Sequence, residues 1–289
     1  MMKTVAFGEL IWDVYPDEAV IGGAPFNFCA HLAHLGDTAY LASATSDDEL
    51  GRQALQHLRR HGVRSELMQV NNHPTGRCMV TLNRQKIPHF EVLTDTAYDN
   101  IAPTDALLDG LRSIQPDVFY FNTLIQRSAC SRHTLERILD TIRFPQIFCD
   151  INLRQNCFDR DSLLRCLQSA TILKVSQEEA HFLPECGVLE AGDAPEIFPA
   201  ELSRRYPNIR LVVYTLGRHG SAVYDAGSGV LYRSDEPENV PVVSTVGAGD
   251  CYGAAFLHGY MAGQSIPDAI RTATERSNLV VSHKEAVPF

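Results

Sequence analysis

Apolar and polar positions along this chain follow two alternating periods. Short apolar runs such as 4–8, 117–121 and 146–151 are typical of buried strands. Between them lie longer stretches with apolar residues at helical spacing, several of which end just before a Gly. Strands that alternate with helices in this way predict crossover units on a mostly parallel sheet. The predicted helices are 24–35, 48–61, 105–114, 131–143, 161–170, 177–183, 195–206, 248–262 and 267–283.

The section 71–101 departs from this alternation. It holds two short strand candidates, 78–82 and 89–93, separated by polar turns that contain Pro, and no helix fits there. Together with 10–21, it predicts a small β lid over a cleft. The sequence therefore predicts one α/β domain over residues 1–289, a doubly wound, mostly parallel sheet flanked by helices, with a lid from 10–21 and 71–101.

Charge and cysteine usage narrow the possible partners and compartment. The net charge is −10 and no block of Lys or Arg stands out, which argues against a nucleic-acid partner. Eight scattered cysteines without a C-x-x-C pair are typical of free thiols in a reducing compartment. We see no signal peptide and no apolar stretch of membrane-spanning length, so we expect a cytoplasmic protein without a membrane partner.

A glycine-rich segment near the end of the chain is the first candidate site. Gly247, Ala248 and Gly249 lead directly into a predicted helix, so their N–H groups and the helix dipole suit the γ-phosphate of a nucleotide. Asp250 follows in the first helical turn and can accept a proton from an attacking hydroxyl. The alternative is a helix-capping acid after a glycine turn, and short glycine motifs alone are weak evidence.

A second cluster lies near the start, where Gly22 and Gly23 precede a predicted helix and Asn27 lies one turn into it. The glycines would let a small polyol approach the backbone, with Asn27 as a hydrogen-bonding arm. A flexible turn with a surface Asn is the simpler alternative for an isolated case. His31 and His34 on the same helix lack a nearby third ligand, so zinc is not expected.

The two clusters together resemble the double signature of the ribokinase-type (PfkB) carbohydrate kinases, Gly-Gly-x-x-x-Asn and Gly-Ala-Gly-Asp. Other segments along nearly the whole chain agree with that family, two of them with its fructokinase-like branch. The agreeing segments are Gly8-Glu9-Leu10-Ile11-Trp12-Asp13, Ala97-Tyr98-Asp99-Asn100-Ile101, Asp150-Ile151-Asn152-Leu153-Arg154 and Thr215-Leu216-Gly217-Arg218-His219-Gly220.

The resemblance implies a role for each matching residue. Asp250 would be the catalytic base, and the N–H groups of Gly247, Ala248 and Gly249 would form the anion hole. The implied sugar-binding residues are Asp13, Gly23, Asn27 and Arg154, and the implied nucleotide-binding residues are Asn152, Ser176, Thr215, Gly217 and Gly220.

Two positions depart from the family pattern. The metal-linked Asn-x-x-Glu is here Ser176-Gln177-Glu178-Glu179, so Glu179 is expected to act on Mg²⁺ through water. Ser244 replaces the acid that helps to hold K⁺ in activated members, so no monovalent-cation requirement is expected.

The resulting expectation is an ATP- and Mg²⁺-dependent sugar kinase with fructose as the favoured acceptor. Ribose, 2-keto-3-deoxygluconate and nucleosides remain open, as does a catalytically silent sugar- or nucleotide-binding regulator. A lone Gly8 after the first strand counts against an NAD-dependent dehydrogenase. Exposed lid edges favour a homodimer that forms through the lid.

Overall fold

The computed structural model describes residues 1–82, 88–154, 156–190, 192–234 and 240–288. Within these residues one large sheet has the strand order β14-β13-β12-β11-β10-β9-β1-β4. Strands β4 to β12 of this order run parallel, and the hairpin β13–β14 adds two antiparallel strands at one edge. The strands are β1 (Lys3–Phe7), β4 (Thr38–Ala42), β9 (Val118–Asn122), β10 (Gln146–Asp150), β11 (Ile172–Ser176), β12 (Leu211–Thr215), β13 (Ser221–Asp225) and β14 (Val230–Arg233).

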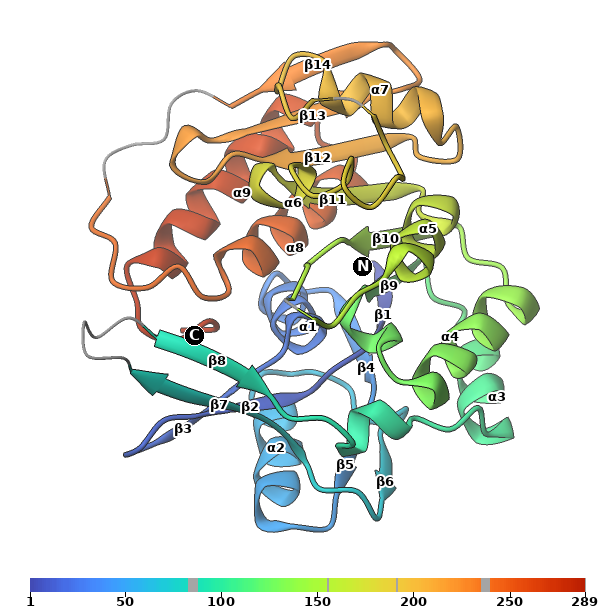
Figure 1. Cartoon of the computed structure of the whole chain (residues 1–289), viewed down its shortest axis with the longest axis vertical. Coiled ribbons are helices and arrows are strands. Elements are labelled where there is room, and N and C mark those ends of the chain that lie inside the picture. Colours follow the sequence, from blue (N-terminus) through green and yellow to red (C-terminus); the bar gives the residue numbers. More distant parts are fainter. Residues whose placement is uncertain (83–87, 155, 191, 235–239, 289) are drawn as a thin grey trace.

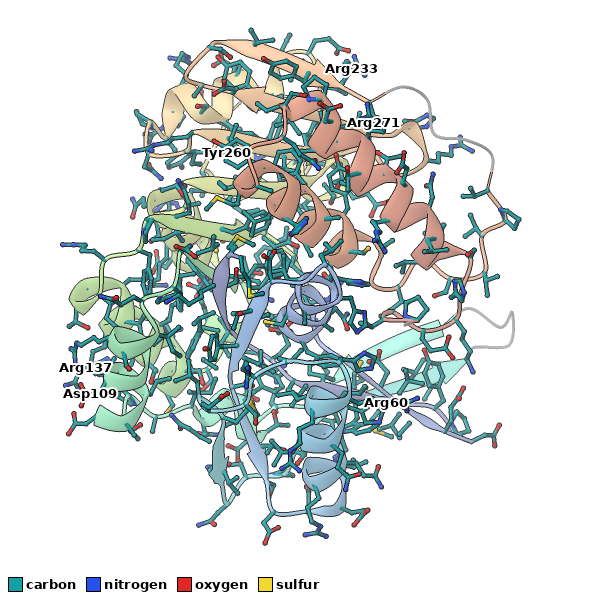
Figure 2. The ribbon with its side chains drawn as sticks, turned by 180° about the vertical axis from the view of Figure 1, so that it is seen from behind. Arg60, Asp109, Arg137, Arg233, Tyr260 and Arg271 are labelled. Carbon is teal, nitrogen blue, oxygen red and sulfur yellow. The ribbon has the colours of Figure 1, made fainter. Side chains whose placement is uncertain are left out.

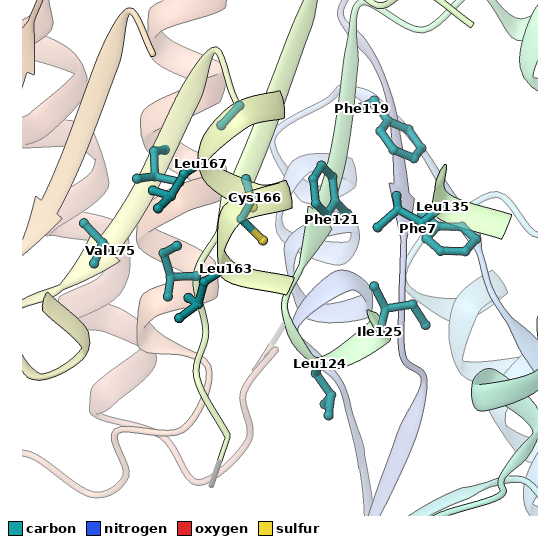
Figure 3. Close-up of a cluster of buried hydrophobic side chains, with 14 of the residues drawn as sticks. Phe7, Phe119, Phe121, Leu124, Ile125, Leu135, Leu163, Cys166, Leu167 and Val175 are labelled. Carbon is teal, nitrogen blue, oxygen red and sulfur yellow. The ribbon is translucent and has the colours of Figure 1, made fainter. Parts of the chain in front are cut away.

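Helices cover both faces of this sheet, because successive strand residues point to opposite faces. On β9, Phe119 and Phe121 join one buried cluster while Tyr120 joins the other. Figure 3 shows Phe119, Phe121, Leu135 and Leu163 as members of the first cluster, and Figure 2, seen from behind, shows α8 and α9 in front of the sheet. The first cluster packs under α3 (Asp105–Ile114), α4 (Ala129–Thr141), α5 (Arg160–Ser169) and α7 (Phe198–Arg205), the second under α1 (Ala24–His34), α2 (Glu49–Arg60), α8 (Ala248–Met261) and α9 (Ile266–Val281).

A second sheet stands apart from the first and confirms the predicted β excursion. This lid sheet has the order β3-β2-β7-β8, with β2 (Ile11–Val14), β3 (Ala19–Gly22), β7 (Gly76–Leu82) and β8 (Pro88–Val92). In Figure 1 it lies at the lower left, away from the large sheet. β2 pairs with β7 in parallel, which joins the two predicted lid segments although they are far apart in the sequence.

The segment that leaves the lid differs from the prediction. A short 3₁₀ helix, η1 (Ala97–Asn100), forms where no helix was expected, because Thr96 and Asp99 cap it reciprocally. Both carboxylate oxygens of Asp99 also accept hydrogen bonds from Arg127, at 2.8 Å each. This buried pair ties the end of the lid to η2 (Leu124–Gln126), the turn that follows β9.

Three other elements also differ in extent from the prediction. The run 39–44 is divided between β4 and β5 (Ala44–Ser46), and β5 pairs with β6 (Gln69–Asn71). The helix α6 covers only Gln177–Ala180, and Pro184 disfavours helical geometry in the residue before it. α7 begins at Phe198, so that Pro199 lies in its first turn, where the missing N–H costs nothing.

Among the described residues, no helix has the length and apolar character needed to cross a bilayer.

Candidate active site

The predicted site residues gather where the parallel strands end. Asn122, Asp150, Ser176 and Thr215 are the last residues of β9, β10, β11 and β12, and Glu9 follows β1. In open α/β sheets, ligands bind in the crevice outside these carboxyl ends. The sheet therefore brings segments from along most of the chain to one edge.

The N-terminus of α8 supplies the predicted anion hole. Gly247 precedes the helix with φ +78°, and no side chain caps the first turn. A Cβ at this position would lie 2.5 Å from that of Ala286, so only Gly fits. The N–H of Ala248 donates to Thr245 at 3.3 Å. A phosphate that binds here therefore competes with a long hydrogen bond for that donor.

Asp250 contacts the other signature directly. The Nδ2 of Asn27 donates to the Oδ2 of Asp250 at 2.8 Å, across 223 residues of sequence. Burial raises the pKa of Asp250, against the effect of this hydrogen bond and of the charge on Lys174. A carboxylate held as an acceptor with a raised pKa is suited to take a proton. The structure thus gives Asn27 a partner in Asp250, and its own Oδ1 is buried without a hydrogen bond.

A buried ion pair lies near this carboxylate. The Nζ of Lys174 contacts both oxygens of Asp150, at 3.0 and 2.8 Å, and both side chains are almost fully buried. Although burial opposes it, the carboxylates of Asp150 and Glu179 raise the pKa of Lys174. A Cβ on Gly249 would lie 3.4 Å from the same Nζ. The ammonium of this ion pair therefore lies close to the predicted anion hole.

The sugar-side residues lie between the lid and the start of α1. Asp13 is on lid strand β2, and burial raises its pKa against the positive charge of exposed Arg154. Gly23 has φ +109°, and a Cβ there would lie 2.6 Å from the carbonyl oxygen of Glu9. The backbone conformation therefore requires Gly at position 23, independently of any role in sugar binding.

The residues predicted to act on the nucleotide and metal lie at the ends of β11 and β12. Ser176 pairs in register with Thr215, and it caps α6 by accepting the N–H of Glu179 at 3.2 Å. The two carboxylate oxygens of Glu179 accept the N–H groups of Ser176 and Leu153, at 2.8 Å each. Glu179 thus caps α6 and holds the loop after β10. Its action on Mg²⁺ through water stays a prediction.

The remaining predicted residues lie in the two adjoining loops. Asn152 has φ +44° and a buried Nδ2 without a hydrogen-bond partner. Gly217 and Gly220 bound the turn after β12, where η3 (Gly217–His219) forms and the N–H of Leu216 donates to Gly220 at 2.8 Å. Both glycines have positive φ. Their contacts with a nucleotide remain predictions.

The donor set fits a magnesium ion that arrives with the nucleotide. In the part of the chain that the structure describes, no group of three or more His, Cys, Asp or Glu residues could hold a metal ion by itself. Mg²⁺ usually keeps several waters and binds to one or two carboxylates together with substrate phosphates. The carboxylates of Asp150 and Glu179 both raise the pKa of Lys174, whose Nζ lies close to Gly249.

Sequence reasoning missed three polar residues that the structure places in this site. Lys174 interrupts the apolar run of β11, Asn122 ends the apolar run of β9, and Glu9 follows β1. A lone charged or amide residue in a buried strand was the available signal, because burial of such a group requires a partner.

The sequence model of the family described as pfkB family carbohydrate kinase matches residues 5–288. The chain belongs to the PfkB family of carbohydrate kinases. A probable fructokinase of Arabidopsis thaliana is 25% identical over 98% of this chain and 91% of its own length. A 5-dehydro-2-deoxygluconokinase of Clostridium tetani is 23% identical over 93% of this chain and 81% of its own.

Solved structures of PfkB-type kinases have the same ribokinase-like fold. Vibrio cholerae fructokinase, with fructose, ADP and calcium ion bound, has a TM-score of 0.80 and 21% identity, over 99% of this chain and 95% of that one. A sugar kinase of Pyrococcus horikoshii in complex with ATP has a TM-score of 0.84 and 23% identity, over 98% and 94%. This PfkB chain is thus a sugar kinase with the predicted α/β fold.

Proposed function

We propose that this PfkB kinase transfers the γ-phosphoryl group of ATP to a hydroxyl of fructose. The observation that carries the proposal is the 2.8 Å hydrogen bond between Asn27 and Asp250. It places the sugar-side signature and the phosphate-side signature at one point, at the N-terminus of α8. Relatives named fructokinase, and neighbours bound to fructose with ADP or to ATP, support this assignment.

In this proposal the residues divide the work of one displacement. Asp250 takes the proton of the attacking hydroxyl as its oxygen bonds to the γ-phosphorus and the bond to ADP breaks. The N–H groups of Gly247 and Gly249 and the charge of Lys174 stabilise the transferring group. Mg²⁺, held by the phosphates with Glu179 acting through water, would neutralise part of their charge. The lid sheet excludes water, which competes as an acceptor.

The second candidate acceptor is an acidic keto sugar, and exposed Arg154 favours it, since its guanidinium could pair with a carboxylate. Fructose remains preferred because Asp13, Glu9 and Asp250 lie close enough for Arg154 to influence the pKa of each. Arg154 is therefore balanced by carboxylates that would repel an acidic substrate. A silent regulator is disfavoured because the chain keeps both the proposed base and the proposed anion-hole residues.

We also propose that the chain forms a single functional domain and that two copies pair through their lids. In the described lid sheet, β3 and β8 are the edge strands, and such edges offer unpaired N–H and C=O groups to a partner.

A coupled assay of ADP release over a panel of sugars with Mg-ATP tests the proposed acceptor. Fructose should give the highest kcat/KM, with ribose, a nucleoside and 2-keto-3-deoxygluconate as the comparison set. A preference of about tenfold for another acceptor, equal to about 1.4 kcal/mol, would reject fructose while leaving the kinase assignment in place.

A further inference from the structure

Glu9 is a buried carboxylate that accepts hydrogen bonds from two nitrogen donors. Its side chain follows β1 and is 1% exposed. The Nδ2 of Asn122 donates to both of its oxygens at 3.0 Å, and the N–H of Ala24 donates to Oε1 at 3.1 Å. The Oδ1 of Asn122 accepts the N–H of Ile125, which fixes the orientation of the amide. Glu9 is therefore surrounded by donors, an arrangement that suits its ionised form.

The contact with Ala24 lies at the beginning of α1. Gly23, the residue before the helix, has no side chain to cap it, so the N-terminal N–H of Ala24 finds its acceptor in Glu9. An anion at this position is also stabilised by the helix dipole. Asn27 lies one turn further on, and its N–H donates to the carbonyl oxygen of Gly23 at 2.9 Å. The carboxylate of Glu9 thus fixes the first turn of the helix that carries Asn27.

The chain of contacts continues from Asn27 to the catalytic carboxylate. Asn27 is 4% exposed and donates to Asp250, so a shift or rotation of the first turn of α1 moves the group that orients the base. Hydrogen bonds thus connect Glu9 to Asp250 through Ala24 and Asn27.

We propose that Glu9 is a positioning residue for phosphoryl transfer, whose ionised carboxylate anchors the start of α1 and thereby orients Asp250 through Asn27. This inference rests on the proposed role of Asp250 as the base. It concerns a residue that the two glycine signatures do not contain, and it makes Asn122 on β9 part of the same arrangement.

Protonation of Glu9 should weaken this arrangement. A protonated carboxyl group is a weaker acceptor than a carboxylate, so the hydrogen bonds from Asn122 and Ala24 would weaken. Burial raises the pKa of Glu9 to about 7, opposed by the Asn122 hydrogen bond and by the charge of Arg154, while the charge of Asp250 adds to the increase. The charge of Glu9 also contributes to the raised pKa of the buried hydroxyls of Tyr98 and Tyr120. Turnover should therefore fall as the pH drops through neutrality.

The test uses Glu9→Gln and the reciprocal pair Glu9→Gln/Asn122→Asp in the full chain. The single variant places an amide against the amide of Asn122 and loses one hydrogen bond. The pair restores the bonds, because Gln accepts from Ala24 and donates to the new carboxylate. Kinetics with Mg-ATP across the pH range, melting temperature and nucleotide binding are measured for both, with Asp250→Asn in parallel.

We expect Glu9→Gln to lower kcat by up to about 100-fold, the cost of small misplacements of catalytic groups, with KM for ATP little changed. Its loss of activity at acidic pH should move to lower pH, since only Asp250 then titrates, and the pair should recover most of kcat.

Wild-type turnover and pH profile in folded Glu9→Gln would overturn the proposal, as would a folded pair without recovery. If Glu9→Gln does not fold, the double variant decides: recovery of its fold and kcat would support the proposal, and failure to recover them would overturn it. Activity retained by Asp250→Asn would instead reject the base itself, which separates the two failures.

Discussion

At the scale of single residues, the buried ion pair of Lys174 and Asp150 places two charged side chains inside the site. Both are buried beside the N-terminus of α8, and the ammonium contacts both carboxylate oxygens. An ion pair of this kind contributes little to stability by itself, because both charges lose their hydration. Removal of one partner is costly, since the other remains buried without compensation. The position of Lys174 close to Gly249 points to a role with the transferring phosphoryl group.

Lys174→Met should therefore destabilise the fold by about 3–5 kcal/mol, the cost of leaving a buried charge unpaired. The double variant Lys174→Met/Asp150→Leu should recover most of that loss, because it removes both charges. Chemical denaturation measures the two free energies of unfolding.

Turnover separates the structural role of the pair from its electrostatic role. The double variant should stay well below wild-type kcat even when it is as stable, because the charge close to the anion hole is gone. A stable double variant with full activity would contradict the role assigned to Lys174.

The sequence predicted those site residues that belong to a recognisable local motif and missed those whose partners are distant in the sequence. Asp250 and the glycines before it could be predicted because small residues ahead of a helix imply an anion site. The hydrogen bond from Asn27 to Asp250 could not, because it spans 223 residues and only the folded sheet brings the two together. Glu9, Asn122 and Lys174 were missed for the same reason: their partners lie on other strands.

At the scale of elements, α6 is a short helix that depends on its cap. Ser176 and Glu179 form a reciprocal box over a helix of four residues, and Glu179 also accepts the N–H of Leu153. The sequence predicted a longer helix, because apolar spacing continues to Leu183 without revealing where the hydrogen bonds end. The same carboxylate is predicted to act on Mg²⁺ through water, so the two roles must be separated by experiment.

Glu179→Gln should raise the Mg²⁺ concentration needed for half-maximal rate and leave KM for the sugar nearly unchanged. It should also cost about 1 kcal/mol in stability, the typical value of a helix cap. Glu178→Gln is the matched control, since Glu178 is exposed in the same turn. Weakened sugar binding with an unchanged Mg²⁺ response would contradict this prediction and would show that Glu179 acts on the sugar instead of the metal ion.

At the scale of the whole molecule, the layers followed from the sequence but the strand order did not. Alternating strands and helices predicted a parallel sheet covered on both faces, and the irregular section 71–101 predicted the lid. The order of the strands, with β1 between β4 and β9, comes from pairing between segments that are far apart in the sequence. The parallel pairing of β2 with β7 is likewise a long-range contact without a local signal.

Pairing of two copies through the lid is the prediction that belongs to this scale. Sedimentation over a range of concentrations should show a reversible dimer, and Val20→Lys should shift it toward monomer, because a charge on edge strand β3 opposes strand addition. Glu49→Lys on α2, which is not part of the lid sheet, is the control. A wild-type protein that is monomeric at every concentration would contradict the proposal.

The central claim is that Asp250 is the base of an ATP-dependent sugar kinase, and sugar-dependent ADP release by Asp250→Asn tests it most directly. Asn keeps the size of the side chain, so the variant should fold and bind sugar and ATP. Its kcat should fall by about 10²–10⁴-fold, the usual contribution of a general base. Asp268→Asn removes the acid from the first turn of α9 and should leave turnover unchanged. Retention of more than about a tenth of the wild-type kcat by Asp250→Asn, well outside the general-base range, would contradict the account.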